Sequence, residues 1–320
     1  MVRPILVPLD GSAFAEAALP VAAALAARTG ARLHLVEVHE QMNAEVGAAG
    51  VAPFDEALDR DALAAESEYL SSIASRWQER TGAALRTELL GGSIASALAT
   101  YAAELDVSLI AMTTHGRGGI SRAWIGSVAD AVVRRSCVPV LLVRPGQTAE
   151  PPNAAPFAPA HVLIPVDGSA LSERVVEPAL EVAGVRDARY TVLRVVGAEP
   201  AALARLDRRD RVDHLTHDRE AAEREIERVV QALHRRGATA QGAVVRRSAA
   251  ALGILGYASS NEIDLIAIAT RGRSGWARLA LGSVADKVMR GASVPVLLYR
   301  PPAPGAAVRD AADAARVANV

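Results

Sequence analysis

Two stretches of the sequence carry residues that could hold a phosphate group. "HGRGGISRAWIGSVAD" runs from His115 to Asp130, and "RGRSGWARLALGSVAD" runs from Arg271 to Asp286. In both, nine residues separate a first glycine from a Gly-Ser pair. Glycine lets a ligand approach the main chain, and a helix that begins at Gly-Ser presents unpaired N–H groups and a partial positive charge. This combination favours a bound phosphate.

The side chains around these glycines fit the same chemistry. Ser127 could be the N-cap of the helix and offer its hydroxyl to a phosphate oxygen, while arginines in each loop add positive charge. The alternative is an ordinary glycine loop before a serine-capped helix, but the same interval after an apolar run in both halves favours phosphate binding. The candidate residues are Gly116, Arg117, Gly126 and Ser127 in the first copy, and Gly272, Arg273, Gly282 and Ser283 in the second.

Asp10 and Asp167 each follow an apolar run directly. One interpretation is local: the aspartate forms an Asx turn or a helix cap, a role that Ser12 and Ser169 could share. The other is functional: the carboxylate accepts a hydrogen bond from an exocyclic amine or a ribose hydroxyl. The residues alone leave both interpretations open.

The elements that must position these residues occur twice, because the chain is a duplication. "ILVPLDGSA" returns as "VLIPVDGSA", and "SLIAMTTHGRGG" returns as "DLIAIATRGRSG". Asp10 corresponds to Asp167 with an offset of 157 residues, and Gly126 corresponds to Gly282 with an offset of 156. We therefore expect a first domain over residues 1–146, a Pro- and Ala-rich linker over 147–160, a second domain over 161–302 and a C-terminal tail over 303–320.

Each half alternates strand-like apolar runs with helical patterns, which predicts an α/β fold with two tandem, doubly wound, five-stranded parallel sheets of Rossmann-like type. One helix is expected over residues 14–30, ending at Gly30, and another over about Ser127 to Arg135. The runs "SLIAM" and "DLIAIA" do not alternate with polar residues, as expected for central strands that are covered on both faces. In such sheets ligands bind beyond the carboxyl ends of the strands, where the strand order reverses.

Composition excludes several other classes of protein. The 320 residues are 51% hydrophobic, and the formal net charge of −1 argues against a nucleic-acid-binding surface. Cys137 is the single cysteine, so no disulfide can form within the chain, and we expect it to be a small buried residue. His214 and His217 lie in a highly charged segment that predicts a solvated helix rather than a metal site. With no apolar run long enough for a membrane span and no signal-peptide pattern at the N-terminus, we expect a cytoplasmic protein.

The two loops resemble the motif of ATP-binding universal stress proteins, which is Gly-x-x-Gly, nine residues, then Gly-Ser or Gly-Thr. Here the motif falls on residues 113–127 and 269–283. The resemblance implies that Asp10 and Asp167 contact adenine, that Val38 and Val195 contact it through their backbones, and that the loops hold the ribose and phosphates of ATP with Mg. The residues that the resemblance assigns to the ribose and phosphates are Thr113, His115, Gly116, Gly126 and Ser127 in the first copy, and Ala269, Arg271, Gly272, Gly282 and Ser283 in the second.

The chain departs from the motif at its first glycine, which is Thr113 in one half and Ala269 in the other. If that position acts through its backbone alone, both residues can replace glycine. If it needs a positive φ, the β-branched Thr113 is strained. His115 in the first loop becomes Arg271 in the second, so the two pockets should differ in phosphate affinity and in pH response.

Three functions fit these residues. The first is an ATP-binding regulatory protein of the stress or growth-arrest response, in which nucleotide occupancy controls loop order, assembly or partner binding. The second is a slow ATP hydrolase, for which His115 is the single candidate base. The third is a scaffold with vestigial pockets. The resemblance also implies a homodimer of tandem chains; the sequence identifies no downstream partner.

Overall fold

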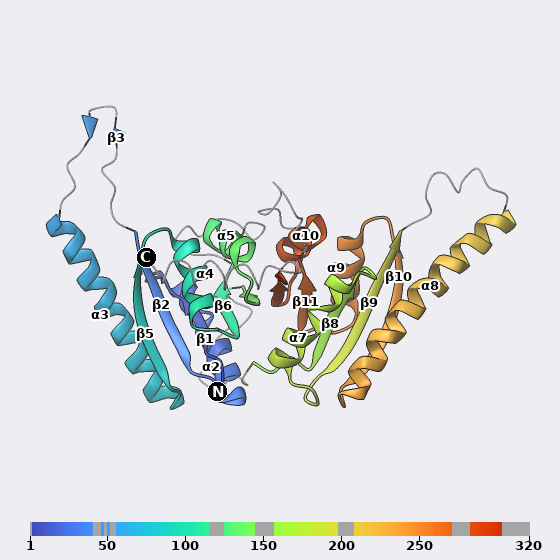
Figure 1. The fold of residues 1–320 in the computed structure, drawn as a ribbon, viewed down its shortest axis with the longest axis horizontal. Coiled ribbons are helices and arrows are strands. Elements are labelled where there is room, and N and C mark those ends of the chain that lie inside the picture. The colour runs from blue at the N-terminus through green and yellow to red at the C-terminus, as the bar shows by residue number, and fades with distance from the viewer. Residues whose placement is uncertain are drawn as a thin grey trace, which may run out of the picture. The chain divides into compact units, whose positions relative to one another are not determined.

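The computed structural model describes residues 2–40, 46–47, 50–51, 56–114, 125–144, 157–197, 208–270 and 282–302. The chain divides into two compact units, Met1–Ala158 and Pro159–Val320, and each is described by itself (Figure 1). Most of the expected linker and the whole expected tail lie outside the described residues. No helix in the described part is long and apolar enough to cross a membrane.

The first unit is built on a parallel sheet in the order β7-β6-β1-β2-β5. Its strands are β1 (Ile5–Pro8), β2 (Leu33–His39), β5 (Leu85–Gly91), β6 (Leu109–Thr113) and β7 (Val140–Val143). Its helices are α1 (Ala13–Glu16), α2 (Leu19–Thr29), α3 (Glu56–Thr81), α4 (Ile94–Glu104) and α5 (Ser127–Arg135). A two-stranded antiparallel hairpin, β3 (Val46–Gly47) and β4 (Gly50–Val51), precedes α3.

The second unit repeats this plan in the order β10-β9-β8-β11-β12, again entirely parallel. Its strands are β8 (His161–Val166), β9 (Arg189–Gly197), β10 (Thr239–Arg247), β11 (Leu265–Ala269) and β12 (Val296–Tyr299). Its helices are α6 (Ala170–Glu173), α7 (Val176–Ala183), α8 (Arg208–Arg235), α9 (Ala250–Ser260) and α10 (Ser283–Gly291). The predicted fold class, two doubly wound five-stranded parallel sheets, is confirmed.

Helices cover both faces of each sheet. In β2, His34 hydrogen-bonds Tyr101 of α4, whereas His39 contacts α3, and residues an odd number of positions apart in a strand point to opposite faces. The long helices α3 and α8 lie along β2–β5 and β9–β10 respectively (Figure 1). Because both faces are covered, every residue of β6 is buried, as the apolar run "SLIAM" predicted.

Two local predictions need correction. The single helix expected over residues 14–30 is broken into α1 and α2, because Pro20 has no N–H to donate and its ring would clash with the Glu16 carbonyl in a continuous helix. The expected end at Gly30 is confirmed, since Gly30 caps α2 with a φ of 71°. Cys137 is exposed rather than buried, because it lies in the short connection between α5 and β7.

A buried charged cluster ties β2 to α3. His39, the last residue of β2, is 6% exposed, and its Nδ1 lies 2.9 Å from Glu66 Oε2 while its Nε2 lies 3.0 Å from Asp59 Oδ1. Burial alone would lower the pKa of His39, but the hydrogen bonds and charges of the two carboxylates raise it above the usual value. The imidazolium form is therefore the stabilising one.

The pKa of His39 gives a pH-dependent stability. A group whose folded pKa is raised contributes stability that is complete below its unfolded pKa, about 6.5, and is lost as the pH rises through the folded value. We expect His39→Gln to lower the free energy of unfolding by about 3 kcal/mol at pH 6, because Asp59 and Glu66 then lose a buried partner. The loss should be smaller at pH 9, as measured by urea denaturation at both values.

His34→Gln is the matched control for this prediction. Burial, with Arg86 and Arg32 nearby, lowers the pKa of His34, so its contribution should diminish as the pH falls. The destabilisation by His34→Gln should thus be greater at pH 9 than at pH 6, the opposite trend. An equal loss at both pH values in His39→Gln would contradict the role given to the imidazolium.

Candidate functional site

The strand order of each unit reverses between the two strands that carry the predicted motifs. β1 pairs with both β2 and β6, and β8 pairs with both β9 and β11. The carboxyl ends of β1 and β6, and those of β8 and β11, therefore flank the reversal, which is where open α/β sheets leave a crevice for ligands. Asp10 follows β1 and Asp167 follows β8, while Thr113 and Ala269 end β6 and β11.

In the second unit a pocket of about 310 Å³ opens at this place. Its lining includes all five of the predicted second-half residues that the structure describes, from four different parts of the unit. They are Asp167, Val195, Ala269, Gly282 and Ser283, and the last two are neighbours at the start of α10. Apolar side chains from α6, β9, α9 and β11 complete the walls: Leu171, Leu193, Ile254 and Ile268. The pocket thus combines an apolar wall with a carboxylate and the start of a helix.

The Asp-Gly-Ser turns after β1 and β8 have the same construction. Asp10 Oδ1 accepts from the Ser12 N–H at 3.0 Å and the Ser12 hydroxyl at 2.6 Å, and Ser12 caps α1 by accepting from Ala15 N–H. Asp167 accepts in the same way from Ser169, which caps α6. The local interpretation is therefore correct for Oδ1 of both aspartates. A carboxylate has two oxygens with about four acceptor positions, so this turn and a ligand can share it.

The backbone resolves the question raised by the missing motif glycines. Among the described non-glycine residues only Asp106 and Glu262 have a positive φ, so Thr113 and Ala269 sit in ordinary strand conformation without strain. Either residue can therefore replace glycine at a position that acts through its backbone. The departure from the motif does not distort either strand.

The N-caps of α5 and α10 lie one residue before the serine that was expected to cap the helix. Gly126 and Gly282 are the N-caps of α5 and α10, without a side-chain cap, and Ser127 and Ser283 are the first helical residues. The two N-caps have φ,ψ of −57°,147° and −57°,141°, a region open to every residue type. The backbone conformation therefore does not by itself require glycine at either position.

In the first unit the described candidates occupy the equivalent places. Val38 is the penultimate residue of β2, Thr113 ends β6, and the Gly126 N–H donates to the Thr114 carbonyl at 2.7 Å, which closes the ends of the loop onto each other. The six remaining candidates lie outside the described residues: His115, Gly116, Arg117, Arg271, Gly272 and Arg273.

The structure adds three residues that the motif analysis missed: Ser172, Arg194 and Glu225. Ser172 lines the 310 Å³ pocket of the second unit. Its hydroxyl accepts a hydrogen bond from the Asp167 N–H at 3.2 Å and donates one to the Ser169 carbonyl at 2.7 Å, so it stabilises the Asp167 turn. Arg194 also lines the pocket and lies 3.3 Å from Glu225 of α8. An alignment of the two repeats could have singled out Arg194, because the residue at its position in the first repeat is the oppositely charged Glu37. The contact between Arg194 and Glu225 of α8 could not have been predicted from sequence spacing.

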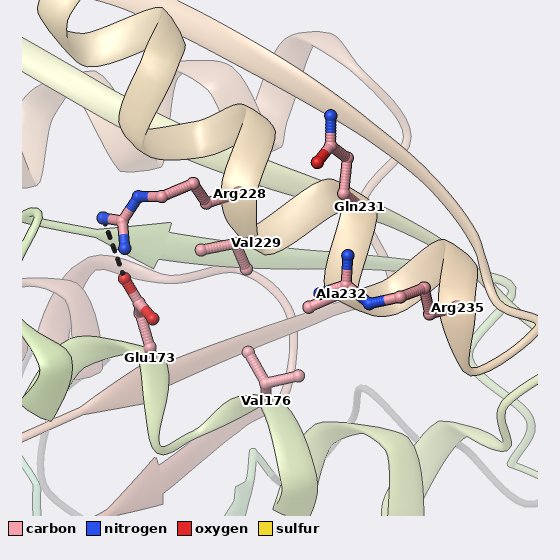
Figure 2. Close-up of a pocket in the computed structure, with 7 residues that line it drawn as sticks. All are labelled: Glu173, Val176, Arg228, Val229, Gln231, Ala232 and Arg235. Atoms are coloured by element: carbon pink, nitrogen blue, oxygen red, sulfur yellow. Dashed lines mark ion pairs between the residues drawn. The ribbon is translucent and has the colours of Figure 1, made fainter.

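A second hollow in this unit, of about 520 Å³, is unrelated to the predicted site. It lies between α6–α7 and the C-terminal part of α8 and contains none of the candidate residues (Figure 2). Glu173 and Arg228 face each other across it at 3.7 Å, with Val176 and Val229 between the helices (Figure 2). Arg235 lies on α8 two turns beyond Arg228, and it lines this hollow but not the pocket at the strand-order reversal.

Comparison with known proteins supports the fold and the duplication described above. A universal stress protein of Mycolicibacterium smegmatis is 26% identical over 302 residues, covering 93% of this chain and 97% of that protein. One from Thermus aquaticus is 36% identical over 145 residues, or 45% of this chain and all of that protein. The crystal structure of a universal stress protein from Archaeoglobus fulgidus has the same fold, with a TM-score of 0.68 at 16% identity over 94% of this chain and 100% of that one. The universal stress protein family model matches residues 1–144 and 160–300, and the chain therefore belongs to this family as a tandem of two such domains.

Proposed function

We propose that this protein is an ATP-binding regulator in the stress or growth-arrest response, in which nucleotide occupancy controls loop order, assembly or partner binding. One observation carries the proposal: residues from both ends of the second unit, Asp167 and Ser283 among them, line a single pocket at the strand-order reversal. Its volume of about 310 Å³ lies at the lower end of the range for small-molecule sites.

The pocket lining fits the parts of an adenine nucleotide. Leu171, Leu193 and Ile254 supply apolar surface for a planar base, and Asp167 and the Val195 backbone supply acceptors and donors at its edge. Gly282 and Ser283 place the N-terminus of α10 at the other side, where the N–H groups and helix dipole favour phosphate. Thus an apolar wall, a polar edge and an anion-binding end occur in one cavity.

Mg would enter with the nucleotide rather than through a protein cage. In the described residues no group of three His, Cys, Asp or Glu side chains is placed to hold a metal ion. Mg²⁺ is usually held by substrate phosphates, waters and one or two carboxylates, so this arrangement suits a Mg–ATP ligand. The protein residues bind and orient the nucleotide, and slow hydrolysis at most is expected of them.

The remaining parts of the proposal follow from the family. We place the protein in the cytoplasm, where ATP is available, and expect a homodimer of tandem chains whose surfaces respond to nucleotide. A downstream protein partner would read the occupied state. The expected dimer, and its response to nucleotide, can be tested by size-exclusion chromatography with and without Mg–ATP.

The glycine N-caps provide a steric test of the site. We expect Gly282→Leu to abolish ATP binding to the second unit, and Gly126→Leu to do the same in the first, because a side chain there fills the space in front of the helix without straining the backbone. The measurement is ATP stoichiometry by isothermal titration calorimetry. Loss of a glycine cap should cost only about 1 kcal/mol of stability, so both variants should remain folded.

Gly256→Leu is the control for these variants. Gly256 lies on the exposed side of α9 with no atom within 4 Å of an added Cβ, so the same side chain enters solvent. It should leave ATP binding unchanged. Undiminished binding in the Gly126→Leu, Gly282→Leu double variant would show that the phosphates are held elsewhere.

The nucleotide content of the purified protein separates the candidate functions. We expect ATP to be released on denaturation, and turnover of added Mg–ATP to be slow or undetectable by phosphate release. Bound ADP with sustained turnover would instead indicate a hydrolase. Absence of bound nucleotide, together with failure to bind added Mg–ATP, would indicate a scaffold with vestigial pockets and overturn the proposal.

A further inference from the structure

The 520 Å³ hollow of the second unit carries one positive charge that the described residues do not offset. Glu173 and Arg228 form an ion pair across the hollow at 3.7 Å, so their charges balance. Arg235 is exposed and makes no hydrogen bond or ion pair with a described residue (Figure 2). An acidic group that entered the hollow would therefore find a free guanidinium at its edge.

The floor of this hollow is apolar and is formed by small side chains. Val229 of α8 is 5% exposed, and Val176 of α7 lies opposite it between the two helices (Figure 2). Ala232, close to one turn further along α8, is partly exposed in the hollow. Because the distance between packed helices depends on the side chains at the contact, a helix with small residues on one face could approach this floor closely.

The described part of the chain ends at the edge of the hollow. Pro302 follows β12, and its carbonyl oxygen accepts a hydrogen bond from the Arg174 guanidinium at 3.1 Å. Arg174 is the C-cap of α6 and follows Glu173 directly, and Glu173 lines the hollow. Residues 303–320 therefore leave the described structure beside the hollow and not on another side of the unit.

The sequence of residues 303–320 begins with a short connection and continues as a helix former. Pro304 and Gly305 interrupt regular structure, and seven of the next fifteen residues are alanine, the residue with the highest helix propensity. As a helix, residues 306–320 would be about 22 Å long, whereas Arg228 and Arg235 are about 10 Å apart along α8. The segment is thus long enough to lie along the whole hollow.

The pattern within this segment gives one face of small residues with an acidic residue beside it. Helical spacing places four alanines in one stripe, and Asp310 lies about 80° from it around the helix. Arg309 and Arg316 lie on the opposite side. The alanines of the stripe are Ala307, Ala311, Ala314 and Ala318.

We propose that residues 306–320 form a helix that docks in this hollow of their own unit, with the alanine stripe against Val176 and Val229 and with Asp310 toward Arg235. Alanine buries little apolar surface, and a stable complex between separate chains needs an interface of about 1,200 Å² or more. A connection of three residues instead gives an effective concentration in the millimolar range, at which weak contacts suffice. The occupant is therefore the chain's own tail and not that of a second copy.

Cross-linking in the full chain tests this docking directly. Cys137 is the single cysteine and is exposed, so Cys137→Ser provides a cysteine-free background. Ala232→Cys with Ala311→Cys then places one thiol in the hollow and one in the alanine stripe. With a short bis-maleimide at low protein concentration, we expect a cross-link within one chain that forms about fivefold or more faster than in the control.

Glu227→Cys with Ala311→Cys is the matched control. Glu227 is exposed on the same helix, is not part of the lining, and lies about 140° around the helix from Ala232. A tail that moves freely would reach both positions. Peptide mapping by mass spectrometry identifies the residues that are joined.

A charge variant tests the contact between Asp310 and Arg235. Arg235→Glu should slow the Ala232–Ala311 cross-link by about threefold, because it replaces an opposite charge with a like one at an exposed site. Asp310→Arg in the same chain reverses the pair and should restore most of the rate. An unchanged rate in Arg235→Glu would contradict the orientation that the proposal gives to the helix.

Hydrogen exchange provides a second measurement that needs no cysteine. Ala311→Glu with Ala314→Glu places two charges in the alanine stripe, and amides of α7 and of the last turns of α8 should then exchange about fivefold faster because the docked helix no longer stabilises them. Arg309→Gln with Arg316→Gln changes the opposite side of the same segment and should leave this exchange unaltered. Amides of α3 serve as an internal reference in both proteins.

The other outcomes would overturn the docking. Equal cross-linking rates at residues 232 and 227, or unchanged exchange in α7 and α8 of the Ala311→Glu, Ala314→Glu protein, would show that the tail does not occupy the hollow. Cross-links between two chains alone would show that the occupant is the tail of a second copy. Circular dichroism confirms that each variant is folded, and Gln231→Cys, which also lines the hollow, replaces Ala232→Cys if that variant does not fold.

Discussion

Parallel pairing at the reversal of strand order is the constraint on which the rest of this structure depends. β1 must accept β2 on one side and β6 on the other, and β8 must do the same with β9 and β11. Chain segments that leave neighbouring strands at the reversal then turn away to opposite faces of the sheet, so their carboxyl ends are not covered by a crossing helix. In the second unit, the Asp-Gly-Ser turn after β8 and the Gly-Ser start of α10 meet at this edge and line one pocket.

The two halves have kept their backbone geometry and changed their side-chain charges. The N-caps of α5 and α10 have nearly identical dihedral angles, and the positive φ of Asp106 is matched by Glu262 in the second copy. Such positions are set by hydrogen bonding and sterics, which tolerate little variation. Strand surfaces at the edge of the site tolerate more, so Arg194 of β9 can stand at the position that Glu37 has in β2 without altering either sheet.

The sequence predicted the sheets and much of the site, because these depend on local patterns. Apolar runs and the motif interval predicted both parallel sheets, α5 from Ser127 to Arg135, and the places of Gly282 and Ser283, whereas Val195 and Ala269 were named only through the family resemblance. Three features escaped that reasoning for physical reasons: the break at Pro20, the exposure of Cys137, and the pairing of Arg194 with Glu225. The break at Pro20 follows from the steric rule for proline and not from hydrophobic periodicity. The exposure of Cys137 and the Arg194–Glu225 pair depend on how distant segments pack.

The lining of the pocket in the second unit has a consequence for when this site can form. It runs from Pro165 at the start of the unit to Ala285 near its end, and Asp264 at the far end of the chain segment accepts from the His161 N–H, 103 residues earlier. Contacts of such sequence separation form late, because loop-closure entropy must be met before they contribute. A ribosome-bound chain would therefore form this pocket only after β11 and α10 have emerged, so no ligand of the pocket could assist the early folding of the unit.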